Sequence, residues 1–446
     1  MSTELARMRD RMVAELTAAD RTVSAPVIEA LRVVPRHLFL PGIPAEVAYR
    51  DDAIVTRRGP DGQPTSSSSQ PTIMAIMLDQ LGLEPGQRVL EIGAGTGYNA
   101  ALMKYLVGPS GTVITVDLDR DVAREATAHL VAAGYPEVMV TAGDGAEGYP
   151  AGAPYDRVIA TVGVSDLAPA WLDQLGPGGR IVVPLDLRGS QRSIAFERTA
   201  EAGGVWLSRS VVPCGFMRMR GSLAGPERTQ VIGGHHELSL TLPDSRTVDL
   251  ATLAANLEAP GGPAAERATR VLAGPAQLFD GLGLWLGLHE PRLGMLSDSG
   301  EAGATALLRA PTSLHGQQVT AGVFDQAGSF AVLARPANYP PEPGGAAGPP
   351  TDPAAGPPAE RRSRRGLRAA PRFELSVLGY GPDGAELAAN LAALLEAWDA
   401  AGRPGTRNFG VRAYPGRAGD GVTPGEGESV LTRPHTTFVV YPLDLS

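Results

Sequence analysis

Residues 89–97 read Val-Leu-Glu-Ile-Gly-Ala-Gly-Thr-Gly, and this stretch decides the fold of the first half of the chain. Its first four residues resemble a buried strand, and a G-x-G-x-G turn follows directly. Glycines let a backbone approach a ligand closely, and the free amide hydrogens at the start of a helix favour an anionic group. The spacing differs from the G-x-G-x-x-G of dinucleotide binders. The stretch therefore predicts a strand, a ligand-binding turn and a helix.

Strand and helix patterns alternate on both sides of this turn. Strands are expected at 88–92, 112–117, 138–142, 155–161 and 180–184, and helices at 98–106, 121–133 and 167–175. Two helices between residues 5 and 34 and a third at 72–83 should precede or adjoin them. The alternation predicts an α/β protein with a doubly wound parallel sheet, in which ligands bind beyond the carboxyl ends of the strands.

Acidic residues stand near the ends of three predicted strands. Glu91 could meet a ligand ammonium, Asp117 could accept hydrogen bonds from two ribose hydroxyls, and Asp144 could accept one from an adenine amino group. Asp117 could instead cap a helix, and Asp144 lies between two glycines, where aspartate is often a turn former. Because three such features follow successive strands, the sequence predicts a site for S-adenosylmethionine, with its methionine carboxylate at the glycine turn.

The bulk composition limits the other possibilities. At 446 residues the chain should form two or three domains, and a net charge of −9 argues against non-specific nucleic-acid binding. The one cysteine, Cys214, excludes an intramolecular disulfide and a cysteine-rich zinc site, so no metal is expected. Neither a signal peptide nor a membrane-spanning stretch is evident. These features predict a cytoplasmic protein, and we expect it to act as a monomer.

Near residue 225 the regular alternation of strand and helix patterns gives way to mixed segments with long Gly/Pro interruptions. We expect residues 1–224 to form the α/β domain and residues 225–446 an α+β accessory domain. A Pro/Gly/Arg-rich insertion at 339–371 should be disordered. Strands predicted at 373–379, 408–414 and 436–441, with a helix at 384–400, are expected to complete a sheet that begins at 329–334.

Seven motifs occur in the order seen in protein-L-isoaspartate O-methyltransferases, a family that residues 5–220 resemble. They are Val34-Pro-Arg-His-Leu-Phe39, Ala48-Tyr-x-Asp51, Ser69-Gln-Pro71, Leu90-Glu-Ile-Gly-Ala-Gly-Thr-Gly-Tyr98, Gly143-Asp-Gly145, Ala153-Pro-Tyr-Asp156 and Gly176-Pro-Gly-Gly-Arg-Ile-Val-Val-Pro184. The resemblance implies a class I methyltransferase, Rossmann-like sheet with a helical N-terminal segment. It also implies methyl transfer from S-adenosylmethionine to a peptide carboxylate.

The resemblance also implies roles for individual residues. Ser69 becomes the catalytic serine that hydrogen-bonds the substrate carboxylate, although without the resemblance it would be taken for the N-cap of the following helix. The expected cofactor-binding residues are Ser68, Gln70, Glu91, Gly93, Ala94, Gly95, Thr96, Gly97, Asp117, Leu118, Asp144 and Gly145. The expected substrate-binding residues are Tyr49, Asp51, Arg57, Arg58 and Arg218. The arginines could contact an acidic peptide, or could be solvated loop residues.

The chemistry is consistent with the absence of an evident catalytic His-Asp or Cys-His arrangement. A side-chain carboxylate is already ionised near neutral pH, so it can attack a sulfonium methyl group without a general base. The enzyme mainly has to align oxygen, methyl carbon and sulfur.

Departures from the repair-type pattern concern the substrate. The segment Thr56-Arg-Arg-Gly-Pro-Asp-Gly62 precedes the serines, and Phe216-Met-Arg-Met-Arg-Gly221 replaces a more apolar segment. With its C-terminal extension, the chain resembles long methyltransferases of actinobacterial lanthipeptide and ATP-grasp ester peptide maturation. The resemblance implies methylation of an aspartate in a precursor peptide, followed by succinimide and isoaspartate formation. Repair of isoaspartyl proteins and a degenerate peptide-binding module remain alternatives.

Overall fold

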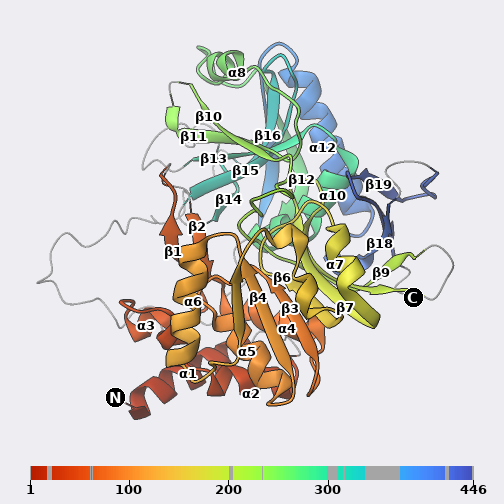
Figure 1. Ribbon diagram of the computed structural model, residues 1–446. Helices are drawn as coiled ribbons and strands as arrows, with labels where there is room; N and C mark the ends of the chain where they lie inside the picture. The colour runs from red at the N-terminus through yellow and green to blue at the C-terminus, as the bar shows by residue number, and fades with distance from the viewer. Residues whose placement is uncertain are drawn as a thin grey trace, which may run out of the picture. The chain divides into compact units, whose positions relative to one another are not determined.

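The computed structural model describes residues 2–17, 23–60, 62, 64–199, 204–233, 235–298, 309–314, 317–336, 372–416 and 421–443 (Figure 1). The predicted disordered insertion at 339–371 lies outside the described residues. The chain divides into two compact units. The first comprises Met1–Leu187, Gln191–Gly225 and Arg407–Ser446, and the second comprises Arg188–Ser190 and Pro226–Thr406.

The first unit is built on a ten-stranded sheet with the order β19-β20-β18-β9-β8-β7-β6-β3-β4-β5. Its parallel part contains β3 (Arg88–Ile92), β4 (Thr112–Asp117), β5 (Met139–Ala142), β6 (Tyr155–Ala160) and β7 (Leu175–Asp186). Between these strands come α5 (Tyr98–Val107), α6 (Arg120–Ala132), the short turns η2 (Gly145–Glu147) and η3 (Pro150–Gly152), and α7 (Pro169–Gln174). The strand order reverses between β3 and β6, which is where a doubly wound sheet binds its ligand. The predicted α/β fold is confirmed.

An N-terminal layer of helices precedes the sheet. It consists of α1 (Ser2–Thr17), α2 (Ala25–Val33), η1 (Arg36–Phe39), α3 (Ala45–Ala48) and α4 (Pro71–Leu81). A two-stranded hairpin of β1 (Ile54–Arg58) and β2 (Pro64–Ser68) is inserted before α4. The apolar positions of α1, α2, α4 and α5 share one core with the sheet, and α4 follows closely on the serines at the end of β2.

The other half of the ten-stranded sheet is antiparallel. It contains β8 (Gln191–Arg198), β9 (Trp206–Pro213), β18 (Phe409–Pro415), β19 (Ser429–Thr432) and β20 (Thr436–Pro442). Strand β18 pairs with β9, and the Phe196 and Phe438 rings of β8 and β20 pack 6.4 Å apart between centroids. In Figure 1 the blue β18 and β19 lie close to the yellow-green β9.

This arrangement corrects a prediction. The strands predicted at 408–414 and 436–441 do not extend the sheet that contains residues 329–334, because they pair with each other and with the open edge of β9. The strand predicted at 373–379 does pair with that sheet, through β16. An alternating apolar pattern identifies a strand but does not indicate which free edge the strand joins.

The second unit contains an eight-stranded sheet with the order β10-β11-β13-β15-β16-β17-β12, and β14 also pairs with β15. The strands are β10 (Arg228–Ile232), β11 (His235–Leu242), β12 (Ala265–Ala273), β13 (Leu293–Asp298), β14 (Thr312–Leu314), β15 (Gln317–Phe324), β16 (Phe330–Ala334) and β17 (Phe373–Tyr380). The helices and turns are α8 (Leu250–Leu257), α9 (Pro275–Gln277), η4 (Leu278–Leu282), α10 (Gly283–His289) and α12 (Gly384–Ala400), and η5 (Thr406–Asn408) begins where the unit ends. Helix α12 packs its leucines and Trp398 against the sheet.

Within the part of the chain that the structure describes, no helix combines the length and the apolar character needed to cross a membrane.

Candidate active site

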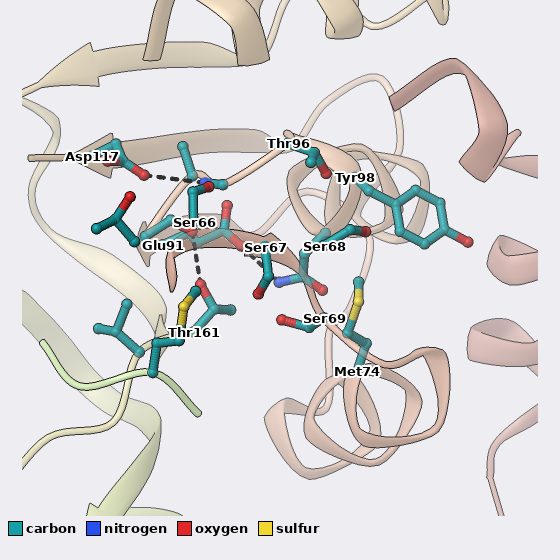
Figure 2. Close-up of a pocket in the computed structure, with 17 residues that line it drawn as sticks. Ser66, Ser67, Ser68, Ser69, Met74, Glu91, Thr96, Tyr98, Asp117 and Thr161 are labelled. Carbon is teal, nitrogen blue, oxygen red and sulfur yellow. Dashed lines mark hydrogen bonds between the residues drawn. The ribbon is translucent and has the colours of Figure 1, made fainter. Parts of the chain in front are cut away.

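A cavity that opens to solvent lies at the carboxyl ends of β3 and β4 in the first unit (Figure 2). Residues 65–69 and the glycine turn at 93–96 form much of its wall, and the rest comes from Met74, Glu91, Tyr98, Asn99, Asp117, Thr161, Val162 and Met217. Its position at the reversal of strand order is where the sequence predicted a ligand.

The turn after β3 requires its glycines. Gly93, Gly95 and Gly97 have φ values of 101°, 52° and 86°, which side chains rarely adopt. A Cβ on Gly93 would lie 2.9 Å from Thr161 Oγ1, and one on Gly95 would lie 3.1 Å from the Ser67 carbonyl oxygen. The turn therefore presents bare backbone to the cavity and leads directly into α5.

Glu91 is a buried acid in the cavity wall, with 0% of its surface exposed. Its Oε1 accepts a hydrogen bond of 2.7 Å from Asn99 Nδ2, whereas Oε2 has no hydrogen-bond partner among the described residues. Burial raises the pKa of Glu91 to about 7. Hydrogen bonding to Asn99 and Thr115 opposes this rise. A buried carboxylate oxygen without a full set of donors is costly, and a ligand ammonium would supply a donor there.

Asp117 lies at the end of β4, beside the glycine turn. Its Oδ2 accepts from the Gly95 amide at 3.1 Å and its Oδ1 from the Asp119 amide at 3.1 Å, while burial raises its pKa. Helix α6 is capped instead by Asp119, whose Oδ1 accepts from the Asp121 and Val122 amides. The alternative in which Asp117 caps the helix is thereby excluded, and Asp117 remains a cavity residue.

The serine run crosses the cavity from the side of Asp117 toward Met74 (Figure 2). Ser66 Oγ accepts from Thr56 Oγ1 across the hairpin at 3.2 Å. Ser68 is 2% exposed, and its Oγ has no hydrogen-bond partner in the described part of the chain. Ser69 follows it in the wall.

Ser69 does not cap α4, although its position before Pro71 suggested this alternative. Asp51 performs that role, because its Oδ1 accepts from the Thr72 amide at 2.8 Å and its Oδ2 from Thr72 Oγ1 at 2.6 Å. Gln70 Nε2 donates to the carbonyl oxygen and to Oδ2 of Asp51, both at 3.0 Å. Asp51 was expected to bind substrate, and Gln70 to bind cofactor; the structure uses both to fix the start of the helix.

Four further expected cofactor residues lie away from the cavity wall. Gly97 begins α5, and Leu118 has 41% of its surface exposed. The Asp144 carboxylate accepts from the Ala146 amide at 3.0 Å and from the Ser222 amide at 2.8 Å, as a turn former does. The Gly145 carbonyl accepts from Trp171 Nε1 at 2.7 Å. The structure brings Ser68, Ser69, Glu91, Gly93, Ala94, Gly95, Thr96 and Asp117 together and places these four nearby.

Tyr49 and the predicted substrate arginines also have protein partners. The Tyr49 hydroxyl is 2.8 Å from His37 Nδ1, and Arg58 Nη1 donates to the Gly62 carbonyl at 2.9 Å. Arg218 Nη1 donates to Asp186 Oδ2 at 2.7 Å.

Arg57 forms an ion-pair cluster with the first turns of α6. Its guanidinium donates to Glu125 Oε1 at 2.7 Å and lies 3.6 and 3.8 Å from carboxylate oxygens of Asp119 and Asp121. None of the five predicted substrate residues belongs to the cavity wall that the described residues define.

The predicted site residues did not include nine residues of the wall, which are Thr65, Ser66, Ser67, Met74, Tyr98, Asn99, Thr161, Val162 and Met217. Thr161 stands directly after β6, and Asp117 is the last residue of β4, so the strand-end rule that found Asp117 applies to Thr161 as well. Its Oγ1 donates to the Gly93 carbonyl at 2.7 Å and thus supports the turn. Met217 lies in a loop distant in the sequence, within the segment 216–221 whose composition departs from the repair-type pattern.

Comparison with known proteins agrees with this geometry. Residues 7–217 match the family model for protein-L-isoaspartate(D-aspartate) O-methyltransferase. The protein-L-isoaspartate O-methyltransferase of Methanopyrus kandleri is 40% identical over 196 residues, covering 44% of this chain and 84% of that enzyme. The chain belongs to this family.

Other relatives extend the comparison. The protein-L-isoaspartate O-methyltransferase of Thermotoga maritima is 41% identical over 175 residues, which are 39% of this chain and 55% of that enzyme. A solved protein-L-isoaspartate O-methyltransferase has a TM-score of 0.45 and 23% identity, and covers 91% of this chain and 96% of its own. Isoaspartate O-methyltransferases are S-adenosylmethionine-dependent carboxyl methyltransferases, so this chain is an enzyme of that class. Most of the second unit lies beyond the family match.

The residues present fit the amino-acid end of S-adenosylmethionine. Counting only the residues that the structure describes, the cavity offers a carboxylate oxygen on Glu91 and a hydroxyl on Ser68 that lack hydrogen-bond partners, and a glycine turn at the start of α5. The Glu91 oxygen suits the ammonium of the cofactor, and the Ser68 hydroxyl suits its carboxylate. The glycine turn lets the amino-acid part of the cofactor lie close to the protein backbone.

Proposed function

We propose that the protein is an S-adenosylmethionine-dependent O-methyltransferase that esterifies the side-chain carboxylate of an aspartate in a ribosomally made, modified precursor peptide. The observation that carries the chemistry is the single cavity that contains both the unpaired Glu91 Oε2 and the Ser68–Ser69 wall. The first feature suits the cofactor, and the second suits a substrate carboxylate.

The chain would hold the cofactor through three contacts. Glu91 Oε2 would accept from the ammonium, Ser68 Oγ and the amides at the start of α5 would donate to the methionine carboxylate, and Asp117 would accept from the ribose hydroxyls. When bound, S-adenosylmethionine supplies an electrophilic methyl group on a sulfonium sulfur.

Ser69 would position the other reactant. Its hydroxyl donates to one oxygen of the substrate carboxylate and leaves the second oxygen free to attack the methyl carbon in line with the sulfur. The carboxylate needs no general base because it is ionised near neutral pH. Met74, Val162 and Met217 exclude water from this side of the cavity, which strengthens the electrostatic interactions inside it.

The ester leads to the rearranged peptide without further help from the enzyme. The backbone amide nitrogen of the following residue attacks the ester carbonyl carbon, the nitrogen loses its proton and methanol leaves. The resulting five-membered succinimide persists or adds water to give aspartate or isoaspartate.

The second unit favours a dedicated peptide over arbitrary damaged proteins. Its eight-stranded sheet has a separate hydrophobic core and lies almost wholly beyond the matched family region. A flexible isoaspartyl segment requires no such unit, so we assign recognition of the precursor peptide to it. The names of the relatives support repair of isoaspartyl proteins as the second candidate.

Methyl transfer with labelled cofactor separates the candidates. The tailoring function predicts fast methylation of the cognate precursor and slow methylation of an unstructured isoaspartyl peptide. Fast turnover of arbitrary isoaspartyl peptides would establish repair instead. Failure to bind S-adenosylmethionine by calorimetry would leave only a degenerate peptide-binding module. Mass spectrometry of the co-expressed precursor distinguishes the methyl ester, the loss of water and the isomer.

A further inference from the structure

The loop after β6 and the segment around Met217 form one side of the cavity, and each holds the other in place. The Gly163 amide donates to the Met217 carbonyl and the Met219 amide donates to the Gly163 carbonyl, both at 2.8 Å. Val162 and Met217, which line the cavity, are therefore neighbours of this paired backbone. We name residues 162–166 and 216–220 the substrate wall.

The substrate wall is anchored to the end of β7. The Val164 amide donates to the Pro184 carbonyl and the Asp186 amide donates to the Val164 carbonyl, both at 2.8 Å. The Asp186 side chain, only 3% exposed, accepts from Arg218 Nη1 at 2.7 Å through Oδ2. One buried carboxylate thus ties the second wall segment to the strand that holds the first.

The turn between β19 and β20, although distant in the sequence, contacts both Asp186 at the end of β7 and Asp166 in the first segment of the substrate wall. Arg433 Nη2 donates to the Asp186 carbonyl at 3.4 Å and lies 3.9 Å from Asp186 Oδ1. The His435 amide donates to Asp166 Oδ2 at 2.7 Å, and Asp166 is 2% exposed. Asp186 therefore lies between two guanidinium groups, and both wall segments are held by residues that follow the matched family region by about 220 positions.

We propose that the β19–β20 turn positions the substrate wall of the methyltransferase, with Arg433 as a positioning residue that acts through Asp186 and Arg218. Arg433 is absent from the cavity wall and does not touch the reacting atoms. Arg433 and Arg218 both place a positive charge near the Asp186 carboxylate, and they compensate its buried negative charge. The turn thereby fixes the distance between Met217 and the serine run, where the proposed function places the substrate carboxylate.

Amide hydrogen exchange tests the positioning directly, without any substrate. Arg433→Met should accelerate exchange at Gly163, Phe216 and Met219 by about tenfold, as expected for the loss of an ion pair with a buried carboxylate and of a hydrogen bond to its backbone carbonyl. Arg412→Met is the matched control, because Arg412 of β18 pairs with Glu428, which precedes β19, and stacks on Tyr441 of β20, none of which belongs to the substrate wall. Equal exchange rates in the wall of both variants would overturn the inference.

An activity measurement separates positioning from general stability. With a fixed isoaspartyl peptide, Arg433→Met should raise the peptide KM about tenfold and leave the calorimetric Kd for S-adenosylmethionine within twofold. Arg433→Lys, which keeps the charge, should recover part of the loss and also covers the case in which the methionine variant folds poorly. An unchanged peptide KM in both Arg433 variants would contradict the proposal. Only this activity measurement rests on the proposed function. Because that function predicts slow methylation of an isoaspartyl peptide, a wild-type enzyme that is inactive on it would not disprove the function, and hydrogen exchange would still decide the inference.

Discussion

Glu91 combines complete burial, one hydrogen bond and one unsatisfied oxygen in the wall of a cavity. Glu91→Gln keeps the shape and removes the charge that would pair with the cofactor ammonium. We expect the Kd for S-adenosylmethionine at pH 8 to rise about 10- to 100-fold, the range for a hydrogen bond to a charged group. Titration calorimetry measures this, with the exposed Glu125→Gln as control. A change below twofold would show that the ammonium binds elsewhere.

Burial raises the pKa of Glu91 to about 7, which also predicts two pH dependences. Because this pKa is above that of the unfolded chain, Glu91 contributes stability that is fully present below pH of about 4.5 and is lost as the pH rises through 7. Cofactor binding favours the ionised form, so affinity should increase between pH 6 and 8. Melting curves and calorimetry across this range check both. In Glu91→Gln the two dependences should flatten together.

Residues at strand ends could be predicted from the sequence because the fold itself brings them together. Glu91, the glycines and Asp117 were found in this way, since they need only their own strand and turn. The contact of Asp51 with the Thr72 amide could not be predicted, because Thr72 is distant in the sequence and becomes a neighbour only after folding. The Ser222 amide that Asp144 binds was hidden for the same reason.

The helix that follows the serine run depends on Asp51. Asp51→Ala removes the cap of α4, and we expect a loss of about 1–2 kcal/mol of stability. Because Ser69 immediately precedes this helix, kcat/KM for a peptide should also fall.

Asp249→Ala is the matched control for that change. Asp249 caps α8 in the second unit through the Ala251 and Thr252 amides and Thr252 Oγ1. It should cost similar stability in chemical denaturation, but an unstructured isoaspartyl peptide should be methylated at the wild-type rate. Equal loss of activity in both variants would refute a local role for the Asp51 cap.

Position 95 in the strand–turn–helix element is unfavourable for a side chain. Gly95→Ala meets a φ of 52° and a backbone oxygen at 3.1 Å, so we expect about 1–2 kcal/mol of strain and a weaker cofactor complex. Gly176→Ala is the control, because its Cβ would make only ordinary contacts of 3.5 Å or more. Calorimetry should find a higher Kd for Gly95→Ala alone; unchanged binding would mean that the turn can relax.

Among the elements, the parallel strands could be predicted and the partners of the last strands could not. The parallel strands are short, apolar and separated by helices, so their order follows from the right-handed crossovers. Strands β18 and β20 are equally recognisable as strands. Their position depends on the free edge of β9, which the sequence does not reveal.

For the whole molecule, the division into units predicts how deletions behave. Replacing residues 226–406 with a flexible linker keeps β18–β20, so this variant should bind S-adenosylmethionine normally and lose the cognate precursor. Truncation after residue 225 exposes the β9 edge and the Phe196 face, and should aggregate. Size-exclusion chromatography and calorimetry distinguish them. If the truncated chain is monomeric and binds the cofactor, the last strands are dispensable.

The pairing of β9 with β18 gives the order of synthesis a role in activity. Val411 donates its amide to Ser208 Oγ, and these residues are 203 positions apart. On the ribosome, the residues of the parallel sheet and of the entire second unit are therefore synthesised before β18 is available to pair with β9 and complete the first unit. Such distant contacts form slowly and late. We expect nascent and prematurely terminated chains to lack methyltransferase activity, so that the enzyme becomes active only after the full-length chain has been synthesised.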